Sequence, residues 1–155
     1  MRELNPEYVE QIGASVNGCP YFQLLSMKLV QLKIGRSLLH IDLGLKHLQP
    51  FGVVHGGVFS SIIDAAAFWA VYSEADEDTG MTTVDLKINY LAPASKGTMI
   101  AEGRSIKLGK TLGLGEATVI DDEGRMLAHG TSTLMILQHF PFQSATPLPF
   151  KFLGT

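Results

Sequence analysis

Apolar residues near the start of the chain recur at the spacing of an amphipathic helix. Val9, Ile12 and Val16 lie three or four residues apart, so they would share one face of a helix. The preceding Asn5–Pro6 pair supplies a capping side chain and a proline suited to the first helical turn. The pattern predicts a short helix over residues 6–17.

Two runs in which apolar and polar residues alternate come next. Val30, Leu32 and Ile34 would lie on one side of the first run, as a half-buried strand requires. We therefore predict strands over residues 28–34 and 37–43, joined by a connection of hairpin length.

The longest apolar stretch of the chain, residues 58–72, follows His55, Gly56 and Gly57. It is rich in alanine and contains no glycine or proline, which favours a helix that continues to about residue 74. Apolar residues occupy every face of this helix, so protein must enclose it on nearly all sides. The stretch is too short and too polar to span a bilayer.

Four further strand-like runs are separated by short turns, and they cover residues 82–91, 98–108, 111–121 and 125–137. Short turns predict that the four strands form an antiparallel meander. A curved antiparallel sheet of about six strands, wrapped around the long helix, would bury that helix. This is an α+β fold of the hotdog type, and we predict one domain over residues 1–138. The Pro- and Phe-rich tail, residues 139–155, is expected to be an irregular surface segment pinned by its aromatic side chains.

Composition excludes several classes of protein. Of the 155 residues 46% are hydrophobic and 17% charged, which excludes disorder and indicates that some apolar surface is buried between subunits. The net charge is -3 without any basic tract, which argues against partners such as nucleic acid or an anionic membrane.

The cysteine and histidine content bears on location and metals. The one cysteine, Cys19, is expected in a turn beside Pro20 and excludes an intrachain disulfide. The five histidines show no His-x-x-x-His pair, so no metal site is expected. No signal peptide is recognisable, and a cytoplasmic location is the expectation.

Asp64 is the one Asp, Glu, Lys or Arg between His47 and Ser73, and it falls within the apolar helix. A buried carboxylate is costly unless it is paired, hydrogen-bonded or functional. A local hydrogen bond from Ser60 or Ser61 is therefore one interpretation, and chemistry is the other.

The start of the same helix offers a second chemical element. Gly56 and Gly57 carry no side chains, so a carbonyl oxygen could approach the first free N–H groups of the helix and be polarised there. Alternatively, the glycines allow only close packing at a tight turn. Gly56 lies eight residues from Asp64, about 12 Å along one helix, whereas reacting atoms must approach within about 3 to 3.5 Å. If the two residues cooperate, the site must be shared across a two-fold dimer.

Three segments of the chain resemble the hotdog-fold acyl-CoA thioesterases of the phenylacetate-pathway and 4-hydroxybenzoyl-CoA type. They are the run QPFGVVHGG over residues 49–57, the acidic Asp64, and the run TVDLKINYLAPA over residues 83–94. The resemblance extends over about residues 20–137. The HGG triplet followed by an acid nine residues after the histidine, with a strand that ends in Tyr-x-x-Pro-Ala, is specific for this branch.

The resemblance implies roles for five residues. Gly56 would polarise the thioester carbonyl, and Asp64 of the other subunit would act as nucleophile or as general base. Thr83 would help to position the water, and His55 would brace the turn. Gln49 stands where the family usually has Asn, so it keeps the amide but departs from the family pattern.

The resemblance also implies a groove for coenzyme A. Its expected lining residues are Gly57, Tyr90, Leu91, Ala92, Pro93, Ala94, Lys107, Gly109, Lys110 and Thr111. The expected function is hydrolysis of an aryl or medium-chain acyl-CoA by a homodimer or a dimer of dimers, with no cofactor. A non-catalytic acyl-CoA binding or sensing protein is the alternative, and it would not need Asp64. Phe51, Phe59, Phe68 and Trp69 would either border the acyl group or belong to the core.

Overall fold

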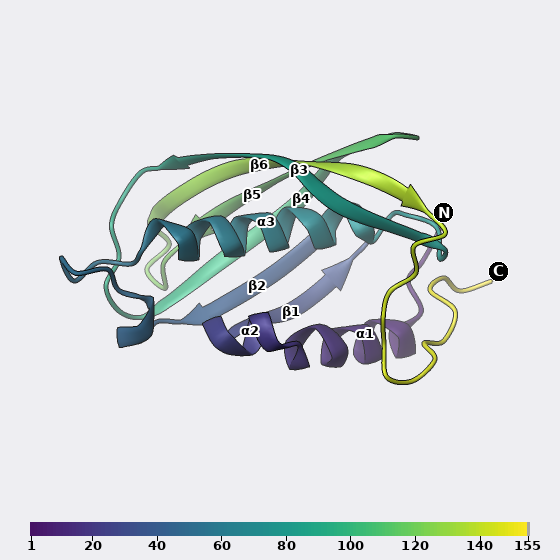
Figure 1. Cartoon of the computed structure of the whole chain (residues 1–155), viewed down its shortest axis with the longest axis horizontal. Coiled ribbons are helices and arrows are strands. Elements are labelled where there is room, and N and C mark those ends of the chain that lie inside the picture. Colours follow the sequence, from purple (N-terminus) through teal and green to yellow (C-terminus); the bar gives the residue numbers. More distant parts are fainter. Residues whose placement is uncertain (155) are drawn as a thin grey trace.

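A computed structural model describes residues 1–154. Three α-helices, one 3-10 turn and six strands follow one another along the chain (Figure 1). In order they are α1 (Pro6–Gly18), α2 (Pro20–Leu25), β1 (Met27–Lys33), β2 (Arg36–Asp42), η1 (Leu45–His47), α3 (Gly56–Tyr72), β3 (Thr79–Tyr90), β4 (Thr98–Leu108), β5 (Leu112–Ile120) and β6 (Met126–Gln138).

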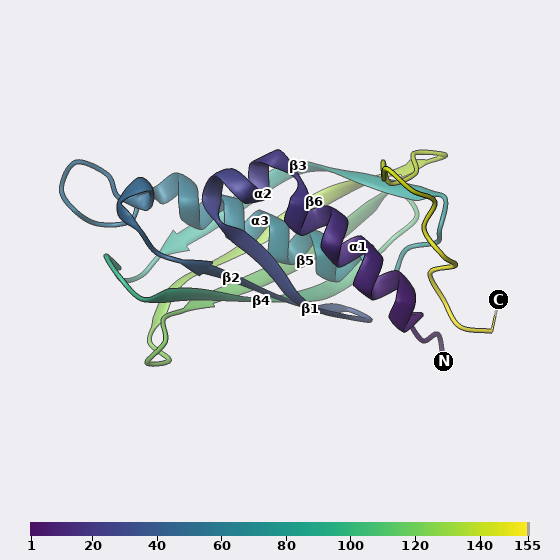
Figure 2. The same ribbon diagram turned by 90° about the horizontal axis from the view of Figure 1, so that it is seen from below.

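All six strands form one antiparallel sheet in the order β1-β2-β4-β5-β6-β3. The sheet curves around α3, and α1 and α2 lie on the other side of that helix (Figures 1 and 2). The predicted hotdog arrangement is confirmed. Of the helices in the part of the chain described, none has both the length and the apolar character that crossing a bilayer would require.

The predicted meander of four strands is wrong at one point. β4, β5 and β6 are consecutive neighbours, but β3 pairs with β6 at the far edge of the sheet and not with β4. The connection from β3 to β4 is no tight turn: Leu91 and Ala92 donate backbone hydrogen bonds to the Leu127 carbonyl (2.9 and 3.1 Å), and Arg125 donates to the Pro93 carbonyl (2.9 Å). These bonds hold the connection against the start of β6 and allow it to bypass two strands.

The first strand also differs from its predicted pattern. Leu32 is buried, but Val30 and Ile34 are exposed, and Leu29 takes the inward place instead. The pairing with β2 shifts between Leu29 and Gln31. Such a bulge adds one residue and moves the following side chains to the opposite face, which strict alternation does not foresee.

Glycines on the concave face of the sheet let α3 lie close to it. A side chain on Gly103 of β4 would collide with the backbone carbonyl of Ala66, which already accepts a hydrogen bond from Ser37 (2.6 Å). On β5, a Cβ on Gly115 would lie 2.8 Å from the Ala67 carbonyl. Ala66 and Ala67 are fully buried. Small residues on both surfaces therefore set a short distance between helix and sheet.

The N-terminal region contains two helices, α1 and α2, and the sequence pattern predicted only α1. α1 begins and ends within one residue of its prediction, and the Asn5 side chain accepts from the Glu7 N–H (3.0 Å). Cys19 does not lie in a simple turn, because it ends α1 and begins α2, with Pro20 in the first turn of α2.

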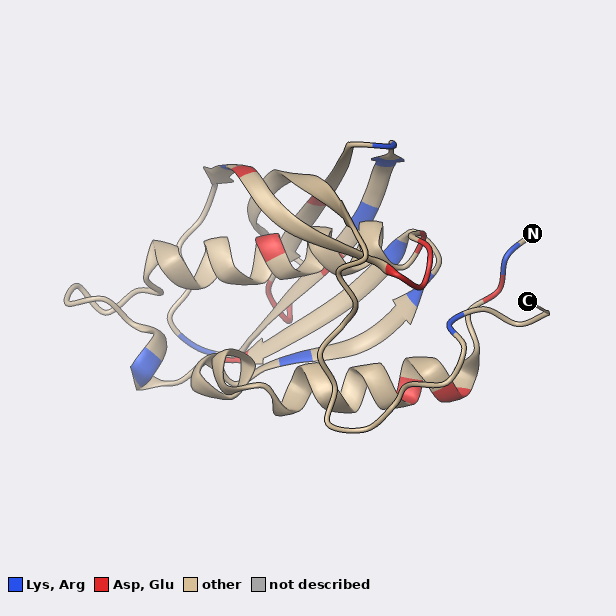
Figure 3. Cartoon of the chain, turned by 45° about the vertical axis from the view of Figure 1, so that its right-hand side comes forward, with Lys and Arg blue, Asp and Glu red and all other residues tan. Residues whose placement is uncertain are grey.

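The tail beyond β6 is irregular and crosses from the sheet to α1 (Figure 3). It ends beside the N-terminal segment, where Leu4 and Phe152 form an antiparallel bridge and the Asn5 N–H donates to the Lys151 carbonyl (2.9 Å). Phe152 is buried, whereas Phe140 and Phe150 are exposed. Both ends of the chain are thus fastened to each other.

Candidate active site

Asp64 lies in the middle of α3, and side chains of two neighbouring strands, β3 and β6, hold its carboxylate. The hydroxyls of Thr83 on β3 and Ser132 on β6 both donate to Oδ1, at 2.8 and 2.9 Å. Oδ2 receives no hydrogen bond from residues 1–154, and it is not a fully buried atom. One carboxylate oxygen is therefore fixed in place while the other remains available.

One of the two interpretations of Asp64, a local hydrogen bond from a neighbouring serine, is wrong. Ser60 and Ser61 donate instead to the Gly57 carbonyl, at 2.9 and 2.8 Å. Ser132 is a partner that sequence reasoning missed. It is a fully buried polar residue at an inward position of β6, between Gly130 and Leu134, and a polar residue at an inward strand position was the only signal.

A hollow of about 320 Å³ adjoins Asp64. Apart from Asp64 and two serines, its lining is aromatic or aliphatic, and it comes from α2, α3, β1 and β3: Tyr21, Phe22, Met27, Ser60, Ser61, Ala65, Phe68, Trp69 and Leu86. Of the four aromatic residues considered in the sequence, Phe68 and Trp69 line this hollow, whereas Phe59 is buried and Phe51 is almost fully exposed. Tyr21 and Phe22 were not foreseen, because α2 was not predicted. The hollow can receive an apolar group whose reacting atom lies near Asp64.

His55 caps the N-terminus of α3. Its Nδ1 accepts from the Gly57 N–H (2.8 Å), and its own backbone N–H donates to the His47 carbonyl (2.8 Å). The Gly56 N–H has no acceptor among residues 1–154. A free N–H at the positive end of a 17-residue helix is suited to polarise a carbonyl oxygen.

The two glycines at this point also permit close packing. A Cβ on Gly57 would lie 3.0 Å from His55 Nδ1, and one on Gly56 would lie 3.3 Å from the Tyr90 hydroxyl. That hydroxyl donates to the Gly56 carbonyl (3.1 Å). Tyr90 therefore lies directly against the helix start, with the ring of Phe59 edge-on to it at 5.8 Å.

Gln49 belongs to the loop that precedes α3. Its side-chain Oε1 accepts from the Phe51 N–H, and its backbone N–H donates to the Val53 carbonyl (2.8 Å). The amide nitrogen of the side chain has no partner among residues 1–154. The loop thus holds the Gln49 oxygen and leaves an N–H₂ group free to donate.

The residues expected to line a coenzyme A groove form two separate groups. The segment from Tyr90 to Ala94 lies at the start of α3, where the Val54 N–H donates to the Ala94 carbonyl (2.8 Å). Gly109 and Lys110 lie at the other end of the helix, beside Ala75, and Lys107 and Thr111 flank them. A helix of 17 residues is about 25 Å long. Within one chain, the two groups therefore do not line one groove.

Metal ligands are not grouped in the part of the chain described: no three His, Cys, Asp or Glu side chains come close enough together to hold an ion.

The chain has clear relatives among known proteins. Residues 51–128 match the family model described as the thioesterase superfamily. The chain belongs to this superfamily. A protein of Saccharolobus solfataricus provisionally named an esterase is 31% identical over 117 residues, which cover 76% of this chain and 83% of that protein. The 1,4-dihydroxy-2-naphthoyl-CoA hydrolase of Listeria monocytogenes is 23% identical over 114 residues, 74% of this chain and 93% of that enzyme.

The structural comparison confirms the fold. The crystal structure of a thioesterase from Haemophilus influenzae superposes with a TM-score of 0.81 at 18% identity, over 93% of this chain and all of that one. The resemblance to hotdog-fold thioesterases is confirmed, and family membership supports a hydrolase activity.

Proposed function

We propose that this thioesterase hydrolyses acyl-CoA to a free carboxylic acid and coenzyme A. The observation that carries the proposal is the state of Asp64: Thr83 and Ser132 hold Oδ1, while Oδ2 is unpaired beside an apolar hollow. A carboxylate placed in this way can act as general base on water or as nucleophile. The CoA hydrolase from Listeria, as a relative, supports coenzyme A as the thiol.

The reaction also needs hydrogen-bond donors that polarise the thioester carbonyl. With Asp64 as general base, the carboxylate takes a proton from water, the oxygen of that water adds to the thioester carbonyl carbon, the C–S bond breaks, and the proton passes to the sulfur of coenzyme A. With Asp64 as nucleophile, the C–S bond breaks as an acyl–Asp64 anhydride forms, and water then hydrolyses the anhydride, which releases the acid, restores the carboxylate and supplies the proton for the thiolate. The free N–H of Gly56 at the start of α3 stabilises the negative charge on the carbonyl oxygen. Gln49 supplies a second donor through its unpaired amide nitrogen.

In this proposal, the Gly56 and the Asp64 that act on one substrate come from different subunits. Gly56 and Asp64 are two helical turns apart on α3, which is about 12 Å, too far to act on one carbonyl. β3 contributes Thr83, and its outer edge has no neighbour in the sheet of residues 1–154. A second copy packed along this edge would bring its own α3 close to Asp64. The same arrangement would allow Tyr90 to Ala94 of one subunit and Lys107 to Thr111 of the other to contact one coenzyme A molecule.

The experiment that tests the proposal measures thiol release from a panel of aryl and fatty acyl-CoAs. Hydrolysis of at least one aryl or medium-chain acyl-CoA is expected. Saturable binding of an acyl-CoA without any thiol release would contradict the proposal and would favour a binding or sensing protein.

A further inference from the structure

A second hollow of about 190 Å³ lies next to the hollow beside Asp64. Phe68 and Trp69 line both, so the two hollows adjoin at these two rings. The second hollow extends along α3 to Tyr72 and reaches Gly80 and Met81 of β3. Its lining is almost entirely apolar, and it lies farther from Asp64 along the same face of the helix, since Asp64, Phe68 and Tyr72 are one turn apart.

The tail closes this second hollow from the outside. Its residues 140–143 complete the lining, and the ring of Phe142 lies edge-on to Trp69 with their centroids 6.1 Å apart. The backbone of Phe140 lies so close to Gly80 that any side chain at Gly80 would collide with it. Phe142 also lines a third hollow of about 250 Å³, which reaches Tyr8 and Lys151. Tyr72 and Pro141 line both of these hollows too, so Phe142 is one of three side chains between the second hollow and the third.

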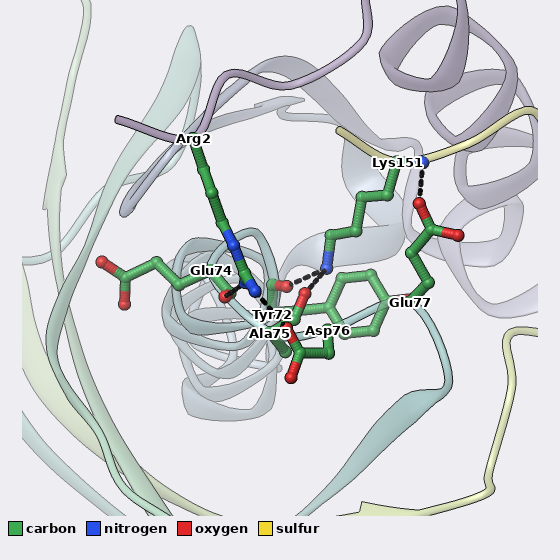
Figure 4. A network of polar contacts seen from close by, with 7 residues as sticks. All are labelled: Arg2, Tyr72, Glu74, Ala75, Asp76, Glu77 and Lys151. Atoms are coloured by element: carbon green, nitrogen blue, oxygen red, sulfur yellow. Dashed lines mark hydrogen bonds and ion pairs between the residues drawn. The ribbon is translucent and has the colours of Figure 1, made fainter. Parts of the chain in front are cut away.

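The tail is fastened on both sides of Phe142. On one side it continues directly from β6. On the other side Lys151, which is fully buried, donates from Nζ to the carbonyls of Tyr72 and Ala75, each at 2.6 Å (Figure 4). The backbone N–H of Lys151 donates to Glu77 Oε1 (2.7 Å). Because the tail is held on both sides of Phe142, the ring of Phe142 keeps a defined position between the two hollows.

We propose that Phe142 forms the end wall of the acyl site, so that the enzyme selects medium-chain acyl groups. The inference rests on the proposed function. The thioester carbonyl lies at Asp64, and the acyl chain passes Phe68 and Trp69 and ends against Phe142. From Asp64 to Tyr72 the helix advances about 12 Å, a distance that a medium-length extended acyl chain spans. An aryl group such as benzoyl fills only the first hollow, and a long chain meets the wall.

The test compares kcat/KM for butanoyl-, octanoyl-, dodecanoyl- and hexadecanoyl-CoA, with 4-hydroxybenzoyl-CoA as the aryl substrate. Wild-type enzyme is expected to prefer octanoyl-CoA. Phe142→Ala removes the aromatic ring that the tail places between the second hollow and the third, so the ratio of hexadecanoyl to octanoyl kcat/KM should rise about tenfold or more, as apolar pockets discriminate by length. Phe142→Leu should raise it less.

The matched control is Phe150→Ala, which removes an exposed phenylalanine from the same tail and should leave the ratio at its wild-type value. Circular dichroism checks that each variant is folded, and the milder Phe142→Leu keeps the test valid if Phe142→Ala is not. An unchanged ratio in a folded Phe142 variant, or a wild-type preference for the aryl substrate, would overturn the inference while leaving the proposed function intact. Failure of wild type to hydrolyse any acyl-CoA would overturn both.

Discussion

At the scale of single residues, the carboxylate of Asp64 has one oxygen, Oδ1, held by hydrogen bonds and a second, Oδ2, that is available for chemistry. Thr83 comes from the edge strand β3 and Ser132 from its neighbour β6, and both donate to Oδ1, so rotation of the carboxylate is restricted. Restraint of this kind places the reactive oxygen before the substrate arrives, which is the basis of efficient acid–base and nucleophilic catalysis.

Replacing Asp64 with Asn keeps the shape and removes the base or nucleophile. We expect kcat to fall by about a hundredfold to ten-thousandfold, with acyl-CoA binding retained. Glu10→Gln, which changes an exposed carboxylate on α1, is the control and should be near wild type. Steady-state thiol release measures both, and a kcat above about a tenth of wild type in Asp64→Asn would contradict the assignment.

The side-chain amide of Gln49 has two roles, one for its oxygen and one for its nitrogen. Its oxygen supports the loop through the Phe51 N–H, and its nitrogen is the group proposed to face the substrate. Gln49→Asn keeps the amide and should lower kcat/KM by less than about tenfold, or about 1.4 kcal/mol, whereas Gln49→Ala should lower it further. If the two variants have equal kcat/KM, Gln49 has no part in the site.

Lys151 should make stability depend on pH. Burial lowers the pKa of its ammonium group from the ordinary 10.5 to about 7, while nearby Asp76 and Glu77 oppose the change. Between these two values the unfolded chain binds more protons than the folded one, so the free energy of unfolding rises with pH, by at most about 1.4 kcal/mol per pH unit.

The measurement is urea unfolding at a series of pH values between about 7 and 10. Wild type should gain stability over this range, and Lys151→Met should lack that gain. Lys28→Met, an exposed lysine on β1, should behave as wild type does. Parallel curves for wild type and Lys151→Met would show that Lys151 keeps its ordinary pKa.

At the scale of elements, the contact between α3 and the sheet depends on small residues. Gly103→Ala places a methyl group against the Ala66 carbonyl and the Ser37 hydroxyl, and overpacking of this kind costs about 1–3 kcal/mol. Gly13→Ala in α1 meets nothing within 4 Å and should stabilise by about 0.5–1 kcal/mol. Thermal denaturation compares the two, and a Gly103→Ala protein as stable as wild type would contradict the close packing.

The elements differ in how far the sequence predicts them. α3 was recognisable because apolar residues on all its faces require enclosure, and this also made Asp64 conspicuous. α2 was not, because six residues with one buried side chain, Phe22, show no periodicity. The place of β3 beside β6 was not predictable either, since alternation specifies a strand but not its neighbour. Tyr21 was missed because it belongs to α2, and Ser132 was missed because the pattern of β6 does not show which inward residue faces Asp64.

At the scale of the whole molecule, a shared site can be tested without knowing the acyl group's identity. Asp64→Ala and Gly56→Pro damage opposite halves of the proposed site, the second by removing the N–H. In a mixed two-fold dimer, one site carries both defects and the other carries neither. Co-expression should restore roughly half of wild-type activity per mixed dimer, or about a quarter overall with random pairing.

The control is that each variant folds and dimerises, which circular dichroism and size-exclusion chromatography establish. Proline is well suited to the first turn of a helix, and Gly56 is the first residue of α3. Complete inactivity of the mixture, given folded dimers, would show that each site lies within one chain or uses other groups.

The pairing of β3 with β6 has a consequence for biosynthesis. A ribosome releases β3 well before β6, because the whole β4–β5 hairpin is translated between them. Until β6 emerges, β3 has no neighbouring strand on either side. Asp64 then lacks the hydrogen bond from Ser132, and the position of Thr83 is not yet fixed. Contacts between strands so far apart in sequence form slowly. The nascent chain therefore passes through an interval in which an unpaired strand is open to chaperones or to other copies of itself.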